Sequence, residues 1–442
     1  MGFAFLQRLS TTRALQIFQV QRLGAVILTS ILFAKSGLSV EEIGAYEMLL
    51  YIGSMFTFLW VNGLLQGIPT VYSEMDEPRQ KVFIFNVFLV FCVISLLFFL
   101  ALAGGARWMV PFLTGQAELP YFFLFCIFLL FNVPTFIVEY VYLLREQPAK
   151  IVVWGGVVFG LQVAFVFVPV WMGWGLRVSF ALLAFLAMLK FLWTLILVLR
   201  PGAFQANWKM IRRYLIFSSP LVANLFVGNL IIMFDNWLVG WYYQDTAIFA
   251  VFRYGSREFP LATALATALA TAMVPVLIAA PEKGLAELRE RTRRLMHLLF
   301  PLTIVLLFIT KPVFPLVFND SFRDSAPLFN IYLLITASRV LLPNAILLSR
   351  GYPAAILWVG ILELLLKVVL GFAFIFWFGL PGLAWSVVLS FWMEKAVLIW
   401  ILQRKYQVAP SEWLDVRLYI GYVVLLLAAF GLSMLLTFNP VL

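Results

Sequence analysis

Long runs of apolar residues recur along the whole chain, and they constrain its fold more than any other feature. Thirteen runs of roughly 20 residues or more are separated by short breaks that contain polar residues, proline or glycine. Apolar residues make up 64% of the chain and charged residues only 12%. A bilayer accommodates that much apolar surface, provided that the backbone satisfies its own hydrogen bonds. Runs of this length, without the alternation of a barrel strand, predict an all-α polytopic membrane protein.

The positions of the breaks and of the basic residues predict the topology. The thirteen predicted spans lie near 13–34, 43–68, 82–103, 119–144, 151–172, 178–199, 211–240, 248–278, 294–318, 326–349, 354–378, 381–403 and 416–437. Lys and Arg residues are retained in cytoplasmic loops. With the N-terminus inside, nineteen basic residues fall in cytoplasmic segments and four in the opposite loops. We therefore expect a cytoplasmic N-terminus, and after thirteen spans an external C-terminus.

The two halves of the chain resemble each other at a shift of 203 to 206 residues. Residues that coincide under this shift include the pairs Pro148 and Pro353, Trp154 and Trp358, Lys190 and Lys395, and Arg200 and Arg404. The shift equals six spans, an even number, so both copies begin on the same side of the membrane. This predicts parallel repeats related by a pseudo-twofold axis along the membrane normal, with a substrate site between the lobes. The predicted organisation is a six-helix lobe at 1–200, a basic cytoplasmic linker at 201–213, a second six-helix lobe at 214–405, and a cytoplasmic loop with an extra transmembrane helix at 406–442.

Fourteen ionisable side chains fall within the predicted spans, where charge is costly and usually faces a cavity or a partner. The eight basic residues are Arg22, Lys190, Arg253, Arg257, Lys311, Arg339, Lys367 and Lys395. The six acidic residues are Glu47, Glu139, Asp235, Glu258, Glu363 and Glu394. The surplus of basic residues indicates that parts of the membrane interior carry positive charge.

Arg253 and Arg257 give the sharpest signal, because a spacing of four residues would place two like charges on one face of the eighth helix. Such charges repel each other unless an anion or another helix neutralises them. The residues predicted to line a hydrated cationic cavity are Arg22, Arg253, Arg257, Arg339, Lys190 and Lys395. The cavity would suit an anionic substrate such as a phosphate or pyrophosphate head group. The alternative, that these side chains snorkel to the interface or pair with acids, stays open.

Two acidic residues have a different expected role. Asp235 is expected to act as a counter-ion or as an ion-coupling carboxylate. Glu363 lies four residues before Lys367, so these two side chains can pair on one helix face, and Glu363 shares the two possible roles of Asp235.

Motifs that indicate an enzyme or an ATP-driven pump are missing from the sequence. It contains no Walker loop, no paired carboxylates in an extramembrane loop and no spacing typical of metal ligands, and His297 is the single histidine. We therefore expect no catalytic residue, no metal ion and no cofactor. Because the basic residues follow the membrane topology, the net charge of +10 does not indicate a nucleic-acid partner.

Three segments carry a recognisable pattern, namely SGLSVEEIGAYEMLLYIGSMF, the stretch from YLIFSSPLVANLF to VFRYGSREF, and FGLPGLAWSVVLSFWMEK. In this order they resemble bacterial polysaccharide flippases of the multidrug/oligosaccharidyl-lipid/polysaccharide exporter superfamily. The resemblance extends to about Lys405. It implies two six-helix lobes around a cationic lumen. It also implies that an undecaprenyl-pyrophosphate-linked oligosaccharide moves from the inner to the outer leaflet of the bacterial cytoplasmic membrane for polysaccharide export.

The resemblance also implies site residues and partners. Arginines in the first and eighth spans line the lumen of related flippases, and Arg22 and Arg253 are the matching positions here. The implied ligands are a lipid-linked glycan and membrane lipids, and the implied partners are a polysaccharide polymerase and a chain-length regulator. The thirteenth span departs from the even number usual in the family.

Two alternative functions remain open. A multidrug antiporter of the same superfamily would export organic cations and would favour an acidic cavity, so the basic surplus in the spans counts against it. A non-transporting scaffold in envelope assembly would leave unpaired arginines at membrane depth unexplained.

Overall fold

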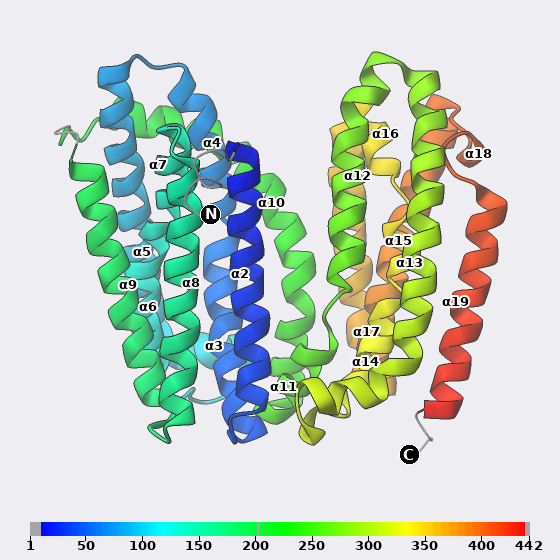
Figure 1. The fold of residues 1–442 in the computed structure, drawn as a ribbon, viewed down its shortest axis with the longest axis horizontal. Coiled ribbons are helices and arrows are strands. Elements are labelled where there is room, and N and C mark those ends of the chain that lie inside the picture. Colours follow the sequence, from blue (N-terminus) through cyan, green and yellow to red (C-terminus); the bar gives the residue numbers. More distant parts are fainter. Residues whose placement is uncertain (1–9, 201–203, 438–442) are drawn as a thin grey trace, which may run out of the picture. The chain divides into compact units, whose positions relative to one another are not determined.

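The described structure consists of helices joined by turns and short connections. A computed structural model of the chain describes residues 10–200 and 204–437, and this part contains no strand. The first half contains α2 (Thr11–Ala34), α3 (Val40–Phe58), α4 (Val61–Ser73), α5 (Glu77–Thr114), α6 (Phe122–Asn132), η1 (Val133–Ile137), α7 (Val138–Leu144), α8 (Pro148–Trp171), α9 (Gly175–Leu199) and α10 (Trp208–Tyr243). The second half contains α11 (Thr246–Gly255), α12 (Pro260–Ala279), α13 (Pro281–Val317), η2 (Asp320–Phe322), α14 (Ser325–Leu333), α15 (Thr336–Arg339), α16 (Pro343–Ser349), α17 (Pro353–Tyr406), α18 (Pro410–Trp413) and α19 (Val416–Thr437) (Figure 1).

The described part of the chain has twelve helical segments that are long and apolar enough to cross a membrane. One of them, α17, has 54 residues, and it would be about 81 Å long at the usual rise, against about 30 Å for the hydrocarbon core. Gly379 interrupts α17 with φ 64° and ψ −147°, a backbone conformation that is essentially restricted to glycine. The segment therefore consists of two successive helices, which correspond to the predicted eleventh and twelfth spans. The all-helical fold and the thirteen predicted helices are confirmed.

The order of helices in the first half recurs in the second half. The first residues of α5 and α13 are 204 positions apart, those of α6 and α14 are 203 apart, and those of α8 and α17 are 205 apart. The fourth span is broken into α6, η1 and α7, and the tenth is broken into α14, α15 and α16. The predicted duplication of six spans therefore appears in the helix boundaries as well as in the residues.

The predicted eighth span is not one continuous helix. Helix α11 ends at Gly255, and residues 256–259 are not helical before α12 begins at Pro260. Proline disfavours a helical backbone at the residue before it, and Phe259 has φ −63° and ψ 107°. The prediction that Arg253 and Arg257 share one helix face was therefore wrong. Arg253 lies in the last turn of α11, whereas Arg257 lies in the connection to α12.

Contacts between residues divide the chain into two compact units. Unit 1 comprises the described residues up to Asn229 together with Gly240–Ala247, and unit 2 comprises Leu230–Val239 together with the described residues from Ile248 onward. Helix α10 begins at Trp208, inside the predicted linker, because the Asn207 side chain accepts a hydrogen bond from the Met210 amide and caps the helix.

Helices α4 and α10 approach each other closely within unit 1. A Cβ atom at Gly63 would lie 2.6 Å from the Val222 Cα atom, so only glycine fits there. The buried Tyr214 hydroxyl donates a hydrogen bond of 2.7 Å to the Leu64 carbonyl. Helix α4 is therefore held to α10 by backbone contact and by a satisfied buried polar group.

Helix α19 packs within unit 2 beside α13 (Figure 1). The Tyr422 hydroxyl shares a hydrogen bond of 2.7 Å with His297 Nδ1, and its ring stacks on Phe300 with centroids 4.9 Å apart. The Tyr419 hydroxyl donates to the Ala337 carbonyl at 3.1 Å. The thirteenth helix is therefore tied to unit 2 by specific contacts.

The close contact at Gly63 gives a stability prediction. Gly63→Ala should lower the free energy of unfolding by about 1–3 kcal/mol, because the new methyl group meets the backbone of α10, which cannot move cheaply. Gly104→Ala is the matched control, since nothing lies within 4 Å of a Cβ atom at that helical glycine. Thermal unfolding in detergent measures both variants. Equal midpoints for Gly63→Ala and the wild type would contradict the packing described here.

Candidate functional site

Arg22 lies near the middle of α2, a helix of 24 residues. At 1.5 Å per residue its Cα atom is about 17 Å from either end, which is the depth of the bilayer centre. Within the described part of the chain, the Arg22 side chain makes no hydrogen bond and no ion pair. An arginine at this depth without a contact partner is rare, because a charge inside the membrane normally faces a partner, a cavity or a ligand.

Glu139, in α7, is the acidic group whose charge acts on Arg22 from within the same unit. Its residue is 7% exposed, and its carboxylate interacts electrostatically with Arg22 although the two do not form an ion pair. Among the described residues Glu139 also makes no hydrogen bond. The sequence analysis counted Glu139 only among the acids of the spans. The available signal was a lone acid within the otherwise apolar fourth span.

Contacts between α2 and α8 fix the position of Arg22. The neighbouring Gln21 donates from Nε2 to the Val152 carbonyl at 3.2 Å. Gly155 allows this approach, because a Cβ atom there would collide with Gln21 Oε1 and would lie 2.6 Å from the Phe18 ring. Figure 1 shows α2 beside α8 along most of its length. The helix that carries Arg22 is therefore firmly held while the arginine keeps its donors available.

Lys190 has a partner in unit 1. Its Nζ atom donates a hydrogen bond of 2.5 Å to Asn132 Oδ1, at the end of α6 where the fourth span breaks. This contact links α9 to the broken span.

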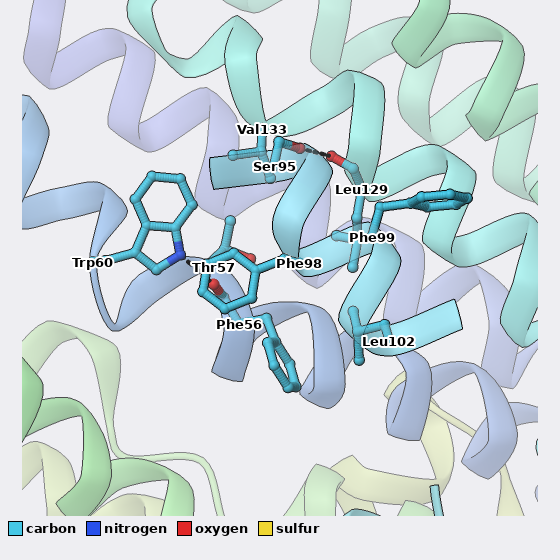
Figure 2. A pocket seen from close by; sticks show the side chains of 9 residues that line it. All are labelled: Phe56, Thr57, Trp60, Ser95, Phe98, Phe99, Leu102, Leu129 and Val133. Atoms are coloured by element: carbon cyan, nitrogen blue, oxygen red, sulfur yellow. Dashed lines mark hydrogen bonds between the residues drawn. The ribbon is translucent and has the colours of Figure 1, made fainter. Parts of the chain in front are cut away.

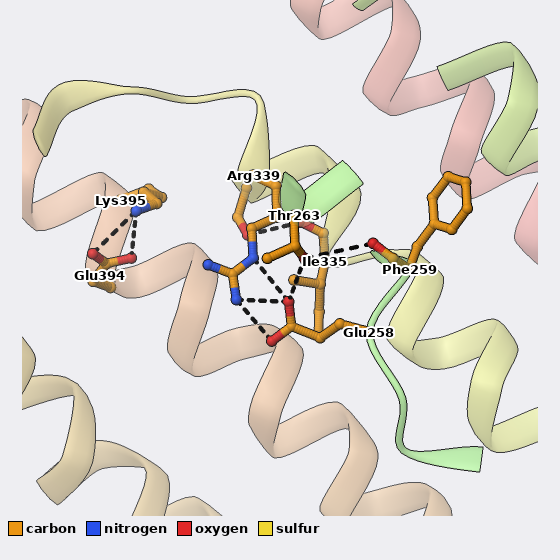
Figure 3. Close-up of polar contacts among 8 residues, drawn as sticks. Glu258, Phe259, Thr263, Ile335, Arg339, Glu394 and Lys395 are labelled. Carbon is orange, nitrogen blue, oxygen red and sulfur yellow. Dashed lines mark hydrogen bonds and ion pairs between the residues drawn. The ribbon is translucent and has the colours of Figure 1, made fainter. Parts of the chain in front are cut away.

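Arg339, in α15, forms a bidentate ion pair with Glu258 (Figure 3). Its Nη2 atom lies 2.7 Å and 2.6 Å from the two carboxylate oxygens of Glu258, and its Nε atom lies 3.0 Å from Oε2. Thr263 donates to the same carboxylate at 3.1 Å, and the guanidinium carbon lies 4.5 Å from the centroid of the Phe391 ring. This geometry occupies the arginine in a planar, two-point contact that joins α15 to the start of α12.

Lys395 is paired with its chain neighbour in α17. Its Nζ atom lies 2.8 Å from Glu394 Oε2, and the two side chains are only 9% and 10% exposed (Figure 3). The positive charge is therefore neutralised locally.

Lys367 is the most buried ion-pair partner of this unit, with a side chain 2% exposed. Its Nζ atom lies 2.7 Å from Asp235 Oδ2 and donates to the Ile231 carbonyl at 2.6 Å. The expected pair between Glu363 and Lys367 does not form, because Asp235 from α10 takes the ammonium group. Glu363 Oε1 and Asp235 Oδ1 are buried without a hydrogen-bond partner among the described residues.

Seven charged residues thus form what we call the unit 2 charge network. Its members are Asp235, Glu258, Arg339, Glu363, Lys367, Glu394 and Lys395. Four acids and three bases nearly balance. The local environment of Arg339 and Lys395 is therefore not a surplus of positive charge.

Arg253 and Arg257 lie near the break between α11 and α12. Arg253 Nη1 donates to Asn236 Oδ1 at 3.3 Å. The Arg257 guanidinium carbon lies 5.1 Å from the centroid of the Tyr254 ring. The two cations therefore use separate contacts instead of facing each other along one helix.

An apolar pocket lies between α3, α5 and α6 in unit 1 (Figure 2). Phe56, Trp60, Phe98 and Phe99 supply most of its wall. Ser95 directs its hydroxyl to the Leu130 carbonyl at 2.9 Å, so its polar group is already engaged. The pocket suits an apolar group and offers no site for a phosphate. No group of three His, Cys, Asp or Glu side chains placed to hold a metal ion occurs in residues 10–200 and 204–437.

Comparisons with known proteins place this geometry in context. The sequence profile described as "Polysaccharide biosynthesis protein" matches residues 38–327, more than half of the chain. No curated protein sequence matches the chain. One similar solved structure is described as the lipid II flippase MurJ in an inward closed conformation, with a TM-score of 0.71 and 15% identity over 96% of this chain and 93% of that chain.

Two further solved structures have the same fold. An inward-facing multidrug resistance MATE family transporter of the MOP superfamily has a TM-score of 0.61 and 14% identity over 96% of this chain and 99% of that chain. The eukaryotic MATE transporter AtDTX14 has a TM-score of 0.54 and 13% identity over 96% and 100%. At these identities the likeness shows the fold alone. The profile match and the shared fold confirm the resemblance seen in the sequence, and this multi-pass membrane protein belongs to the polysaccharide biosynthesis protein family of the multidrug/oligosaccharidyl-lipid/polysaccharide exporter superfamily.

Proposed function

We propose that the protein is a flippase that moves an undecaprenyl-pyrophosphate-linked oligosaccharide from the inner to the outer leaflet of the bacterial cytoplasmic membrane. Family membership and the flippase-like fold support this class of function. The N-terminus would lie in the cytoplasm, in line with the distribution of basic residues. A polysaccharide polymerase and a chain-length regulator would act on the product.

The observation that carries the proposal is Arg22, which lies at membrane depth without an ion pair in the described structure. A guanidinium group binds phosphate oxygens through two parallel hydrogen bonds, and such bonds are stronger away from water. The electrostatic pull of Glu139 stabilises the arginine when no substrate is present. The same carboxylate repels a bound pyrophosphate, which favours release after transport.

Arg253 and Arg257 are the proposed second contact for the anion. Arg253 is next to a neutral amide and Arg257 is next to an aromatic ring. Lys190, Arg339 and Lys395 have close polar partners, and these favour a structural role over contact with substrate.

Substitution of Arg22 tests the flippase function. Proteoliposomes with a fluorescent lipid-linked oligosaccharide in both leaflets are treated with an impermeant quencher, and loss of inner-leaflet fluorescence reports flipping. Arg22→Gln should slow flipping by about 10- to 100-fold, the worth of one charged hydrogen-bonding group. Arg22→Lys keeps the charge without the two-point geometry and should fall between Arg22→Gln and the wild type.

Arg177→Gln is the matched control, because Arg177 is exposed at the start of α9 and far in sequence from the candidate site. It should flip at the wild-type rate. Wild-type flipping by a folded Arg22→Gln variant would rule out the role of Arg22.

A second candidate function is antiport of organic cations. It is favoured by the buried oxygens Glu363 Oε1 and Asp235 Oδ1, which have no hydrogen-bond partner in the described part of the chain. Buried acids of this kind bind cations. Cation efflux from the same proteoliposomes under a proton gradient, with no flipping of any lipid-linked sugar, would support this function and reject the flippase.

The ion pair between Lys367 and Asp235 gives a separate prediction about the two acids. Lys367→Met should destabilise the protein by about 3–5 kcal/mol, because it leaves Asp235 buried without its partner. Adding Asp235→Asn to Lys367→Met should restore most of that loss. Lys283→Met, at an exposed position, is the control. If the double variant unfolds no later than Lys367→Met in a detergent melt, Asp235 is not the counter-ion of Lys367.

A further inference from the structure

A basic pocket lies in unit 1 where the end of α4 meets the start of α10. Its charged wall consists of Glu74, Lys209, Arg212 and Arg213, and its apolar wall includes Ile216 and Phe217. The pocket encloses about 910 Å³, part of it open to solvent, which is within the usual range of about 300–1,000 Å³ for ligand sites. It is separate from Arg22 and from the unit 2 charge network in the residues that form it.

The charges of the pocket are only partly neutralised. Arg213 Nη2 pairs with Glu74 Oε2 at 2.5 Å. Lys209 and Arg212 make no hydrogen bond and no ion pair within the described residues. Three bases against one acid leave two cations available for an anionic ligand.

The basic wall is held in place by the neighbouring backbone. The buried side chain of Asn86 accepts a hydrogen bond from the Asn207 amide at 2.8 Å and donates to the Gln205 carbonyl at 2.9 Å. Lys209 therefore begins from a fixed point on α10. Arg213 is held from the other side by Glu74, at the C-terminal end of α4.

The apolar wall points to a lipid instead of a free anion. Ile216 is 61% exposed and Phe217 is 40% exposed, and exposed apolar side chains on a transmembrane helix face lipid. Helix α10 has 36 residues, about 54 Å, so its first turns extend beyond a hydrocarbon core of about 30 Å. Trp208, exposed beside Lys209, is the residue type that marks this interface.

We propose that this pocket binds the phosphate head group of an anionic phospholipid, with Lys209 and Arg212 holding the phosphate and with Ile216 and Phe217 lying along the start of an acyl chain. Basic pockets between transmembrane helices bind such head groups. A zwitterionic lipid would place a second positive charge beside two unpaired cations and would bind more weakly. The bound lipid bridges α4 and α10. The proposal does not depend on the function proposed above.

The test measures binding of phosphatidylglycerol labelled on its acyl chain to the full-length protein in a neutral detergent, with labelled phosphatidylcholine as the comparison lipid. The wild type should bind phosphatidylglycerol saturably and more tightly than phosphatidylcholine. The double variant Lys209→Gln/Arg212→Gln should weaken phosphatidylglycerol binding by about 30-fold, since each basic group near a membrane surface is worth about 1 kcal/mol.

Glu74→Gln provides a variant with the opposite expected sign. Removing this carboxylate frees Arg213 for the ligand, so phosphatidylglycerol should bind several-fold more tightly. A folding defect would not produce that gain. The matched control is Arg350→Gln/Arg404→Gln, which removes two exposed cations outside the pocket and should leave binding unchanged.

Three results would overturn the proposal. The first is equal phosphatidylglycerol affinity for the wild type and Lys209→Gln/Arg212→Gln. The second is full displacement of the lipid by inorganic phosphate, which would indicate a site for the free anion. The third is binding of a polyprenyl pyrophosphate at this pocket without binding of phosphatidylglycerol, which would indicate a loading site for the transported lipid.

Discussion

Charge inside an apolar helical fold is tolerated only where another charge, a dipole or a ligand meets it, and the rest of this structure depends on that constraint. Unit 2 meets it internally, through the bidentate pair of Arg339 with Glu258 and the buried pair of Lys367 with Asp235. These contacts join α15 to the start of α12 and α17 to α10. Removal of one partner from such a pair is expensive, so the network restricts how these helices can move against each other.

Arg22 differs from those residues in what satisfies it. Its helix is held by Gln21 and by the close approach at Gly155, yet the guanidinium has only the longer-range attraction of Glu139 within the described structure. A fixed helix with an available cation is a preorganised anion site, because little is lost in ordering it when the anion arrives. The balance between Glu139 and the substrate would keep binding weak enough for turnover.

The fold was predictable from the sequence because membrane spans depend on local composition. Apolar runs revealed the thirteen helices, and the coincidence of Pro148 with Pro353 revealed the repeat. Charge pairing was not predictable, because it depends on packing between distant segments. The local rule favoured Glu363 with Lys367, but a pair of that kind is worth only about 0.2–0.5 kcal/mol and Asp235 displaced it. The break before Pro260 had a clear signal in the proline, which we interpreted only as a possible bend.

The central claim is that Arg22 binds the pyrophosphate of a lipid-linked oligosaccharide. An experimental structure of the protein with such a lipid bound would test it most directly, because phosphorus atoms scatter strongly and the arginine is on a well-held helix. The account predicts phosphate oxygens within hydrogen-bonding distance of the Arg22 guanidinium, with Glu139 not paired to it. Pyrophosphate density remote from Arg22, with Arg22 and Glu139 joined in a contact ion pair, would contradict the account.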